Sequence, residues 1–187
     1  MPSFGAFFDA NVLYPAELRN LLMRLATTGL FRANWSAEVH EEWMSSLLAN
    51  RPDLSRTQLE RTRALMDMHV PYALVKDYED LIEALQLPDP KDRHVLAAAI
   101  RAKSAVIVTM NLKDFPPGNI AQYGIEALHP DEFIGHLLDV SAETVIEAAR
   151  LHRACLKNPP QSPAEYLEAL RRQELFHTVI ALQGKAI

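Results

Sequence analysis

The chain has one cysteine, no long apolar run and no excess of positive charge, and each absence narrows what the protein can be. Cys155 has no partner for an internal disulfide, which is typical of a reducing compartment. No stretch is apolar over the length that a bilayer span requires. The first residues, MPSFGAFFDANVLYP, lack the basic region and the apolar run of a signal peptide. We therefore predict a cytoplasmic protein without membrane association.

The missing positive charge bears on nucleic acids as partners. The formal net charge is −5, which argues weakly against a phosphate-rich partner, although a carboxylate site for cations would contribute to that charge. Four arginines are clustered in one short segment: Arg51, Arg56, Arg61 and Arg63. The cluster is either an RNA-facing patch or, at least as readily, an exposed helix face paired with Asp53 and Glu60.

The residues that are present predict an α/β fold. A length of 187 residues is enough for one domain with a sizeable core. Short apolar runs alternate with segments whose apolar residues recur at helical spacing. The predicted strands cover residues 4–8, 31–35, 72–75, 105–108 and 125–128. This alternation predicts a mainly parallel sheet flanked by helices.

Local signals mark the starts of several helices. Ser55 and Gln58 have the spacing of a capping box, and residues 162–165 combine an N-cap serine, a first-turn proline and a capping-box glutamate. A helix is predicted from Asp89 through Lys103. From about residue 141 the sequence is helical in character without evident chemistry. We predict an α/β domain over residues 1–139 and a helical extension over residues 140–187, which packs on the domain or binds a partner.

Acidic residues lie where an open parallel sheet binds its ligands, beyond the carboxyl ends of the strands. Asp9 ends the first predicted strand, and Asn111 and Asp114 follow the fourth. Glu42 and Asp92 lie early in helices. Oxygen ligands of this number suit Mg²⁺ or Mn²⁺, and the histidine or cysteine spacing of a zinc site is absent. Acids that converge at one edge would raise one another's pKa unless a cation lay between them.

Helix geometry distinguishes between neighbouring acids. At 3.6 residues per turn, Glu42 flanks the apolar face of its helix, whereas Glu41 points to the far side. Asp92 shares the buried side of its helix, although an acid there is also favoured by the helix dipole. Asp89 precedes a first-turn proline and is more simply an N-cap than a ligand. His94 is interpreted as an ordinary surface or core residue of its helix; a general-base role stays open, without support from the sequence.

Four segments resemble the acidic motifs of PIN-domain nucleases, in order and at similar spacing. They are FFDANVLYP, SAEVHEEW, DPKDRHVLAAAI and IVTMNLKDFP. The resemblance covers roughly residues 4–138, and it is the ordered set that is specific. The residues of these motifs are most similar to those of VapC-type toxins of bacterial VapBC toxin–antitoxin systems, specifically a longer subgroup with a C-terminal helical extension.

This resemblance implies a three-layer α/β/α domain that cleaves RNA with Mg²⁺ or Mn²⁺, by in-line attack of a metal-activated water. It also implies a cognate antitoxin, and we expect a homodimer. The catalytic residues would be Asp9, Glu42, Asp92 and Asn111, and the metal ligands would be Asp9, Glu42, Asp92 and Asp114. Many members have aspartate where Asn111 stands, so Asp114 is expected to substitute or assist, and the number of ions stays open. Candidate phosphate contacts are Lys91, Arg93 and Lys113.

Two other functions are compatible with the sequence. A catalytically silent PIN-like module that binds RNA or protein is kept open by Asn111 and by the acidic charge; stabilisation by Mn²⁺ would distinguish a working site from it. A haloacid-dehalogenase-like phosphatase would use Asp9 as a nucleophile that forms an aspartyl-phosphate. The second aspartate of that motif is replaced by Asn11, which places this alternative far behind.

Overall fold

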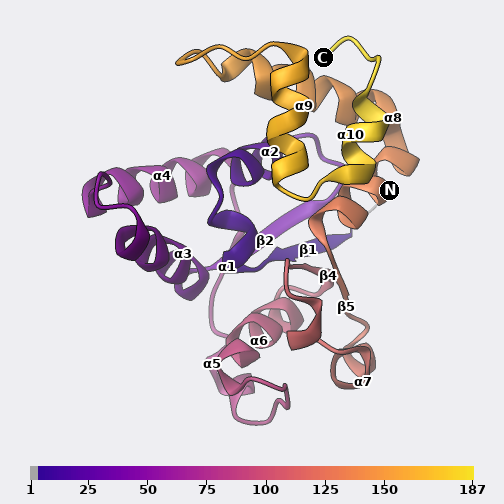
Figure 1. Ribbon diagram of the computed structural model, residues 1–187. Helices are drawn as coiled ribbons and strands as arrows, with labels where there is room; N and C mark the ends of the chain where they lie inside the picture. Colours follow the sequence, from indigo (N-terminus) through magenta and orange to yellow (C-terminus); the bar gives the residue numbers. More distant parts are fainter. Residues whose placement is uncertain (1–3) are drawn as a thin grey trace.

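The computed structural model describes residues 4–187, which fold around a five-stranded sheet (Figure 1). The strands are β1 (Gly5–Phe8), β2 (Arg32–Ser36), β3 (Leu74–Val75), β4 (Ser104–Val108) and β5 (Glu126–Leu128). Their order in the sheet is β3-β2-β1-β4-β5, and every neighbouring pair is parallel. The predicted parallel α/β fold is confirmed.

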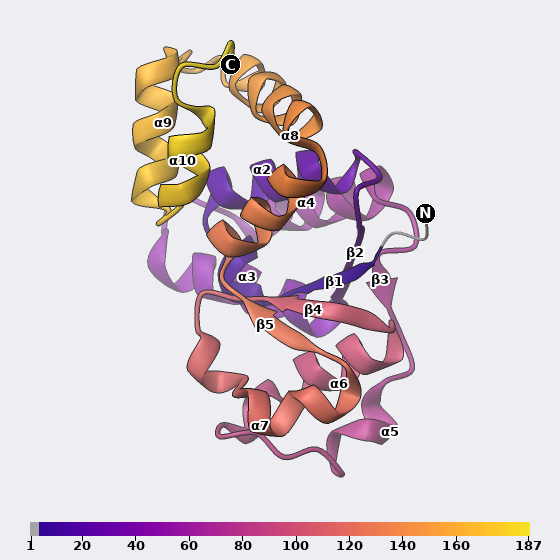
Figure 2. The ribbon, with the colours of Figure 1, turned by 90° about the vertical axis from the view of Figure 1, so that its right-hand side faces the viewer.

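Helices cover both faces of this sheet. They are α1 (Ala10–Leu13), α2 (Ala16–Ala26), α3 (Ala37–Asn50), α4 (Arg56–His69), α5 (Glu79–Ile82), α6 (Arg93–Arg101), α7 (Pro117–Ile120), α8 (Pro130–Cys155), α9 (Pro163–Arg172) and α10 (Phe176–Leu182). Short 3-10 turns are η1 (Pro90–Asp92), η2 (Leu112–Asp114) and η3 (Ala121–Tyr123). In Figure 2, α2 and α8 lie on one side of the sheet and α6 lies on the other, which gives three layers.

The central strand β1 is wholly buried, and it fixes the position of the residue that follows it. All four of its residues are buried, as expected for a parallel strand covered on both faces. Phe8 packs against the rings of Phe31, Trp35 and Phe133, and the ring of Phe133 comes from α8. Because this aromatic packing fixes the end of β1, the position of Asp9, the next residue, is also fixed.

Gly5 allows β1 and β4 to approach closely. A Cβ at this position would lie 2.9 Å from the Cα of Ser104 and 3.3 Å from the carbonyl oxygen of Lys103. Backbone atoms of a central strand cannot yield cheaply, so Gly5→Ala is expected to lower the free energy of unfolding in urea by about 1–3 kcal/mol. Gly135→Ala is the control, because no described atom lies within 4 Å of its added Cβ and alanine suits a helix. Equal losses in both variants would contradict this explanation.

Two predicted elements differ from the structure. The strand predicted at residues 72–75 is reduced to β3, because Tyr72 has φ 70° and is 98% exposed. A left-handed residue does not continue a strand. The helix predicted from Asp89 to Lys103 begins as the turn η1 and becomes α-helical only at Arg93.

Helices α8 and α9 pack against α2, and α10 packs against both α8 and α9. Helix α8 is kinked at Ser141, where φ is −158° and ψ is 88°. Asp131 at the start of α8 accepts hydrogen bonds from the backbone N–H groups of His177 and Thr178, both at 2.8 Å, and from Thr178 Oγ1 at 2.7 Å. One buried carboxylate therefore joins α10 to α8. Within the described part of the chain, no helix is both long and apolar enough to cross a membrane.

Candidate functional site

Asp9 follows β1 directly and is held by three hydrogen-bond donors. Its side chain is 8% exposed. Oδ1 accepts a hydrogen bond from the backbone N–H of Ala10 at 2.7 Å, which caps α1. Oδ2 accepts hydrogen bonds from Thr109 Oγ1 and from Asn11 Nδ2, both at 2.8 Å. The orientation of this carboxylate is therefore fixed by the fold.

Two of these donors come from loops that the parallel sheet brings together. Thr109 follows β4, which lies beside β1 with Phe8 opposite Val108. Asn11 accepts a hydrogen bond at Oδ1 from the backbone N–H of Met110, at 3.0 Å. Asn11, which lies in α1 directly after β1, thus connects α1 to the loop after β4, at the carboxyl edge where such sheets bind ligands.

A cavity of about 570 Å³ opens at this edge, and the acids predicted as metal ligands line it. Its carboxylates are Asp9, Glu42, Asp92 and Asp114. Its other lining residues are Ala10, Asn11, Tyr14, Trp43, Ser45 and Ser46, so the described lining includes no lysine or arginine. The structure therefore brings together all four predicted ligands without a basic side chain among them.

Burial and repulsion raise the pKa of two of these carboxyl groups. The pKa of Asp92 rises from 3.8 to about 6, because burial disfavours the charge and because Asp114, Asp9 and Asp89 repel it. Burial also raises the pKa of Asp9, although the hydrogen bond from Thr109 opposes this rise. For Asp92, the expected effect of converging acids on pKa is confirmed.

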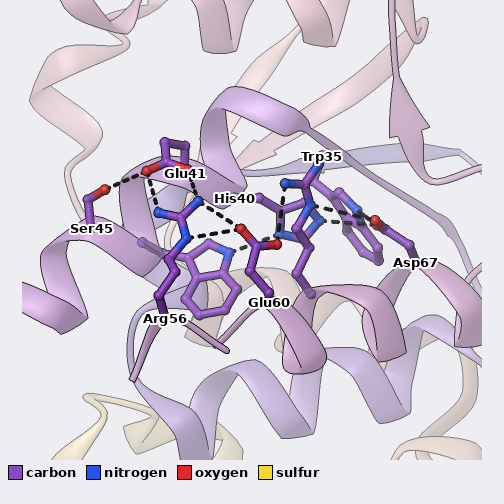
Figure 3. Close-up of polar contacts among 9 residues, drawn as sticks. Trp35, His40, Glu41, Ser45, Arg56, Glu60 and Asp67 are labelled. Carbon is purple, nitrogen blue, oxygen red and sulfur yellow. Dashed lines mark hydrogen bonds and ion pairs between the residues drawn. The ribbon is translucent and has the colours of Figure 1, made fainter. Parts of the chain in front are cut away.

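Glu42 and Glu41 diverge as helix geometry predicted. Glu42 lines the cavity, and its Oε1 lies 2.9 Å from Nε2 of His94. Glu41 does not line the cavity; it accepts hydrogen bonds from both terminal nitrogens of Arg56 and from Ser45 Oγ (Figure 3). These contacts lower the pKa of Glu41 to about 2.

Asn111 and Asp114 divide the role expected of the fourth motif. Asp114 lines the cavity. Asn111 donates its side-chain amide to Asp114 and its backbone N–H to Thr109 Oγ1, the latter at 3.1 Å. The direct ligand at this position would therefore be Asp114, and Asn111 would hold it. This arrangement fits the expectation that Asp114 substitutes for the missing aspartate.

The other predicted residues lie around the cavity and do not line it. Lys91 in η1 and Lys113 in η2 are exposed, and Arg93 at the start of α6 is partly buried. All three directly neighbour Asp92 or Asp114 in the sequence. Asp89 accepts a hydrogen bond from the backbone N–H of Lys91 at 2.9 Å, as an N-cap does.

Most of the clustered arginines are paired with acids. Arg56 lies 2.7 Å from the carboxylate of Glu60 (Figure 3). Arg63 lies 3.7 Å from the same carboxylate. Arg51 lies 2.6 Å from Asp53. The structure thus favours the interpretation of an exposed, charge-paired helix face over that of an RNA-facing patch.

The donor set of the cavity has the chemistry of a divalent-cation site. Carboxylate oxygens are the ligands that Mg²⁺ and Mn²⁺ prefer, and their charges here have no basic partner in the lining. Among residues 4–187, no group of three or more His, Cys, Asp or Glu side chains is already gathered at ligating distance. The larger hollow of about 680 Å³ between α8 and α10 is lined by three histidines and by four acids, of which Asp131 already accepts three hydrogen bonds from α10. The acidic cavity at Asp9 differs from it in lying at the carboxyl ends of β1 and β4, where such sheets bind ligands.

Comparison with known proteins agrees with this fold. The chain matches the family model of the PIN domain over residues 6–113, more than half of its length, and so belongs to the PIN-domain family. A second model, the VapC50 C-terminal domain, matches residues 130–184. The chain is 44% identical to "Putative ribonuclease VapC50" of Mycobacterium tuberculosis over 96 residues. This aligned region covers 51% of the present chain and 56% of the relative. The chain thus spans little more than half the length of this relative. The resemblance to a VapC-type PIN chain with a C-terminal extension is confirmed, and no solved structure matches.

Sequence reasoning missed two residues that contact the acids. Thr109 was taken only as the end of a strand, and His94 only as part of a helix. Their partners, Asp9 and Glu42, lie 100 and 52 residues away along the chain. The one available signal was position: Thr109 follows a predicted strand, and His94 lies two residues after Asp92.

Proposed function

We propose that this protein is a metal-dependent endoribonuclease that acts as the toxin of a type II toxin–antitoxin system. The observation that carries the proposal is the cavity lined by Asp9, Glu42, Asp92 and Asp114 without a basic side chain in the described lining. An RNA backbone is itself anionic and would be repelled by four carboxylates. The cavity can accept RNA only when cations neutralise that charge.

The chain's own residues would place and hold those cations. Asp9 is the most rigid ligand because three donors orient it. Asp92, whose pKa is about 6, is charged mainly above that pH, so cation binding should strengthen as pH rises through 6. Bound Mg²⁺ or Mn²⁺ would polarise the scissile phosphodiester and lower the pKa of the attacking water. Lys91, Arg93 and Lys113 would contact phosphates beside the cavity.

The partners proposed for this activity are an RNA substrate and a cognate antitoxin, and the site would work in a cytoplasmic homodimer.

We also propose that the nuclease domain covers residues 1–139 and that residues 140–187 form the extension. The relative named as a ribonuclease and the PIN-domain match support the activity. The kink of α8 at Ser141 supports the boundary.

The test is cleavage of mixed cellular RNA by purified protein, free of antitoxin, with Mn²⁺ or Mg²⁺ and with EDTA. We expect discrete products that require the metal and return when Mn²⁺ is added back after EDTA. Asp9→Asn and Asp92→Asn, purified in the same way, should give none. Absence of cleavage by a folded wild-type preparation would overturn the proposal, and cleavage that survives both substitutions would mean that another site or a contaminant is responsible.

A further inference from the structure

His94 is a buried side chain that lies between two acids of the neighbouring helix. It is 4% exposed and belongs to α6. Its Nε2 lies 2.9 Å from Oε1 of Glu42, and its Nδ1 lies 3.6 Å from Oε2 of Glu38. Glu38 and Glu42 are four residues apart on α3, so both carboxylates face the same imidazole. Nδ1 makes no hydrogen bond within the described part of the chain, which leaves Nε2 as the atom that holds α3.

The partner of Nε2 is a partly exposed acid of the cavity. The Glu42 side chain is 42% exposed, whereas Asp9 is nearly buried and is held by three donors. A long, half-exposed glutamate samples many rotamers unless a contact restricts it. His94 supplies that contact at Oε1, and the described residues other than Arg32 donate no hydrogen bond to Oε2. One oxygen is therefore anchored, and the other stays available to a ligand.

A second buried histidine shows what is particular to this contact. His40 lies 3.1 Å from Asp67, and that carboxylate also accepts a hydrogen bond from Trp35 at 2.8 Å (Figure 3). Asp67 does not line the acidic cavity, so the His40–Asp67 contact joins α3 to α4 outside it; the other ring nitrogen of His40 accepts a hydrogen bond from Trp43 Nε1 at 3.0 Å. The His94 contact joins helices in the same way but ends on a cavity carboxylate.

We propose that His94 is a positioning residue that orients Glu42 toward a cation in the acidic cavity by donating its Nε2–H to Oε1. The inference rests on the proposed function, because it gives Glu42 the role of a metal ligand. Hydrogen-bond partners of carboxylate ligands contribute to metal affinity by fixing the ligand before the ion arrives. Loss of His94 should therefore weaken cation binding without any loss of a ligand.

The experiment measures Mn²⁺ affinity of the full chain by the electron paramagnetic resonance signal of free Mn²⁺, without RNA. In His94→Leu the dissociation constant should rise about 10-fold. His94→Gln, whose amide can reach Glu42, should recover most of the affinity, whereas the shorter amide of His94→Asn should not. Glu38→Gln removes the other neighbouring acid and should bind Mn²⁺ as wild type does. Cooperative thermal unfolding in EDTA will show that each variant is folded. If His94→Leu does not fold, the difference in Mn²⁺ affinity between His94→Gln and His94→Asn tests the role of His94 in its place.

Coupling to Glu42 completes the test. If His94 acts through Glu42, the double variant Glu42→Gln/His94→Leu should bind Mn²⁺ no more weakly than Glu42→Gln alone. Additive losses, or wild-type affinity in folded His94→Leu and His94→Asn, would overturn the role of His94 and leave the proposed function intact. A wild-type protein that binds no Mn²⁺ would overturn the proposed function and this inference together.

Discussion

Replacing Asp92 with asparagine is expected to abolish RNA cleavage and, at the same time, to stabilise the metal-free protein. In the folded state the pKa of Asp92 is about 6, above its ordinary value of 3.8, because of burial and because of repulsion from Asp114, Asp9 and Asp89. A raised carboxyl pKa means that the charged form destabilises the fold. That cost is fully present above pH 6 and disappears as pH falls to 3.8.

The size of this effect follows from the pKa shift. About two pKa units correspond to nearly 3 kcal/mol, and partial exposure of Asp92 reduces this to about 1–2 kcal/mol. Thermal unfolding in EDTA at pH 8 should therefore show a midpoint about 2–6 °C higher in Asp92→Asn than in wild type. With Mn²⁺ the order should reverse, because the folded wild type alone binds the ion tightly. Cleavage should fall about 10²–10³-fold or more.

Asp89→Asn is the control for Mn²⁺ binding and cleavage, although it also removes one of the charges that raise the pKa of Asp92. Asp89 is exposed and caps η1, and asparagine caps equally well. This variant should keep both the gain in stability with Mn²⁺ and the cleavage activity. A metal-free Asp92→Asn protein no more stable than wild type at pH 8 would show that the cavity carboxylates do not repel one another as described.

The C-terminal extension is expected to lose stability as pH falls from 6.5 toward 4, because of His152. This side chain is 4% exposed in α8; its Nδ1 lies 2.9 Å from the Tyr166 hydroxyl, and its Nε2 has no hydrogen-bond partner among residues 4–187. Burial first, and then the charge of Arg24, lower the pKa of His152 from 6.5 to about 4. The unfolded chain therefore takes up a proton in this window that the folded chain refuses.

The shift of about 2.5 pKa units predicts a loss of about 3 kcal/mol between pH 6.5 and pH 4 from this one residue. Urea unfolding at a series of pH values in wild type and His152→Gln measures it, since other titrating groups, including Asp92 and His40, are common to both chains. The variant should lose about 3 kcal/mol less over this range. His136→Gln replaces an exposed histidine of the same helix and should keep the wild-type slope. Parallel pH curves for wild type and His152→Gln would contradict the prediction.

Local signals in the sequence were sufficient to predict where some helices start and which way their side chains point. The capping boxes at Ser55 and Ser162 predicted the starts of α4 and α9, because their hydrogen bonds lie within four residues. Helical periodicity separated Glu42 from Glu41, because the direction of a helical side chain follows from its position along the turn. Tyr72 was assigned to a buried strand because apolar character alone does not reveal a left-handed backbone.

The contacts that complete the site could not be predicted in this way. The environment of Asp9 depends on the neighbour relation of β1 and β4, and that of Glu42 depends on the packing of α6 against α3. Neither relation has a signature within a short window of sequence. The acids themselves were identifiable because carboxylates after strands and at helix starts form a pattern, whereas a threonine or a histidine that supports them has no such pattern.

The pairing of β1 with β4 also determines when the acidic cavity can assemble during synthesis of the chain. Asp9 emerges from the ribosome early, but Thr109, which orients it, emerges 100 residues later, together with the strand that pairs with β1. Between these two moments β1 lacks one of its two neighbours in the sheet, and the loop after β4 that carries Asp114 does not yet exist. Contacts of such high sequence separation form late in folding. A nascent chain shorter than about residue 114 therefore has no assembled acidic cavity, and the ribosome that makes the protein is not exposed to its completed site until most of the sheet has been translated.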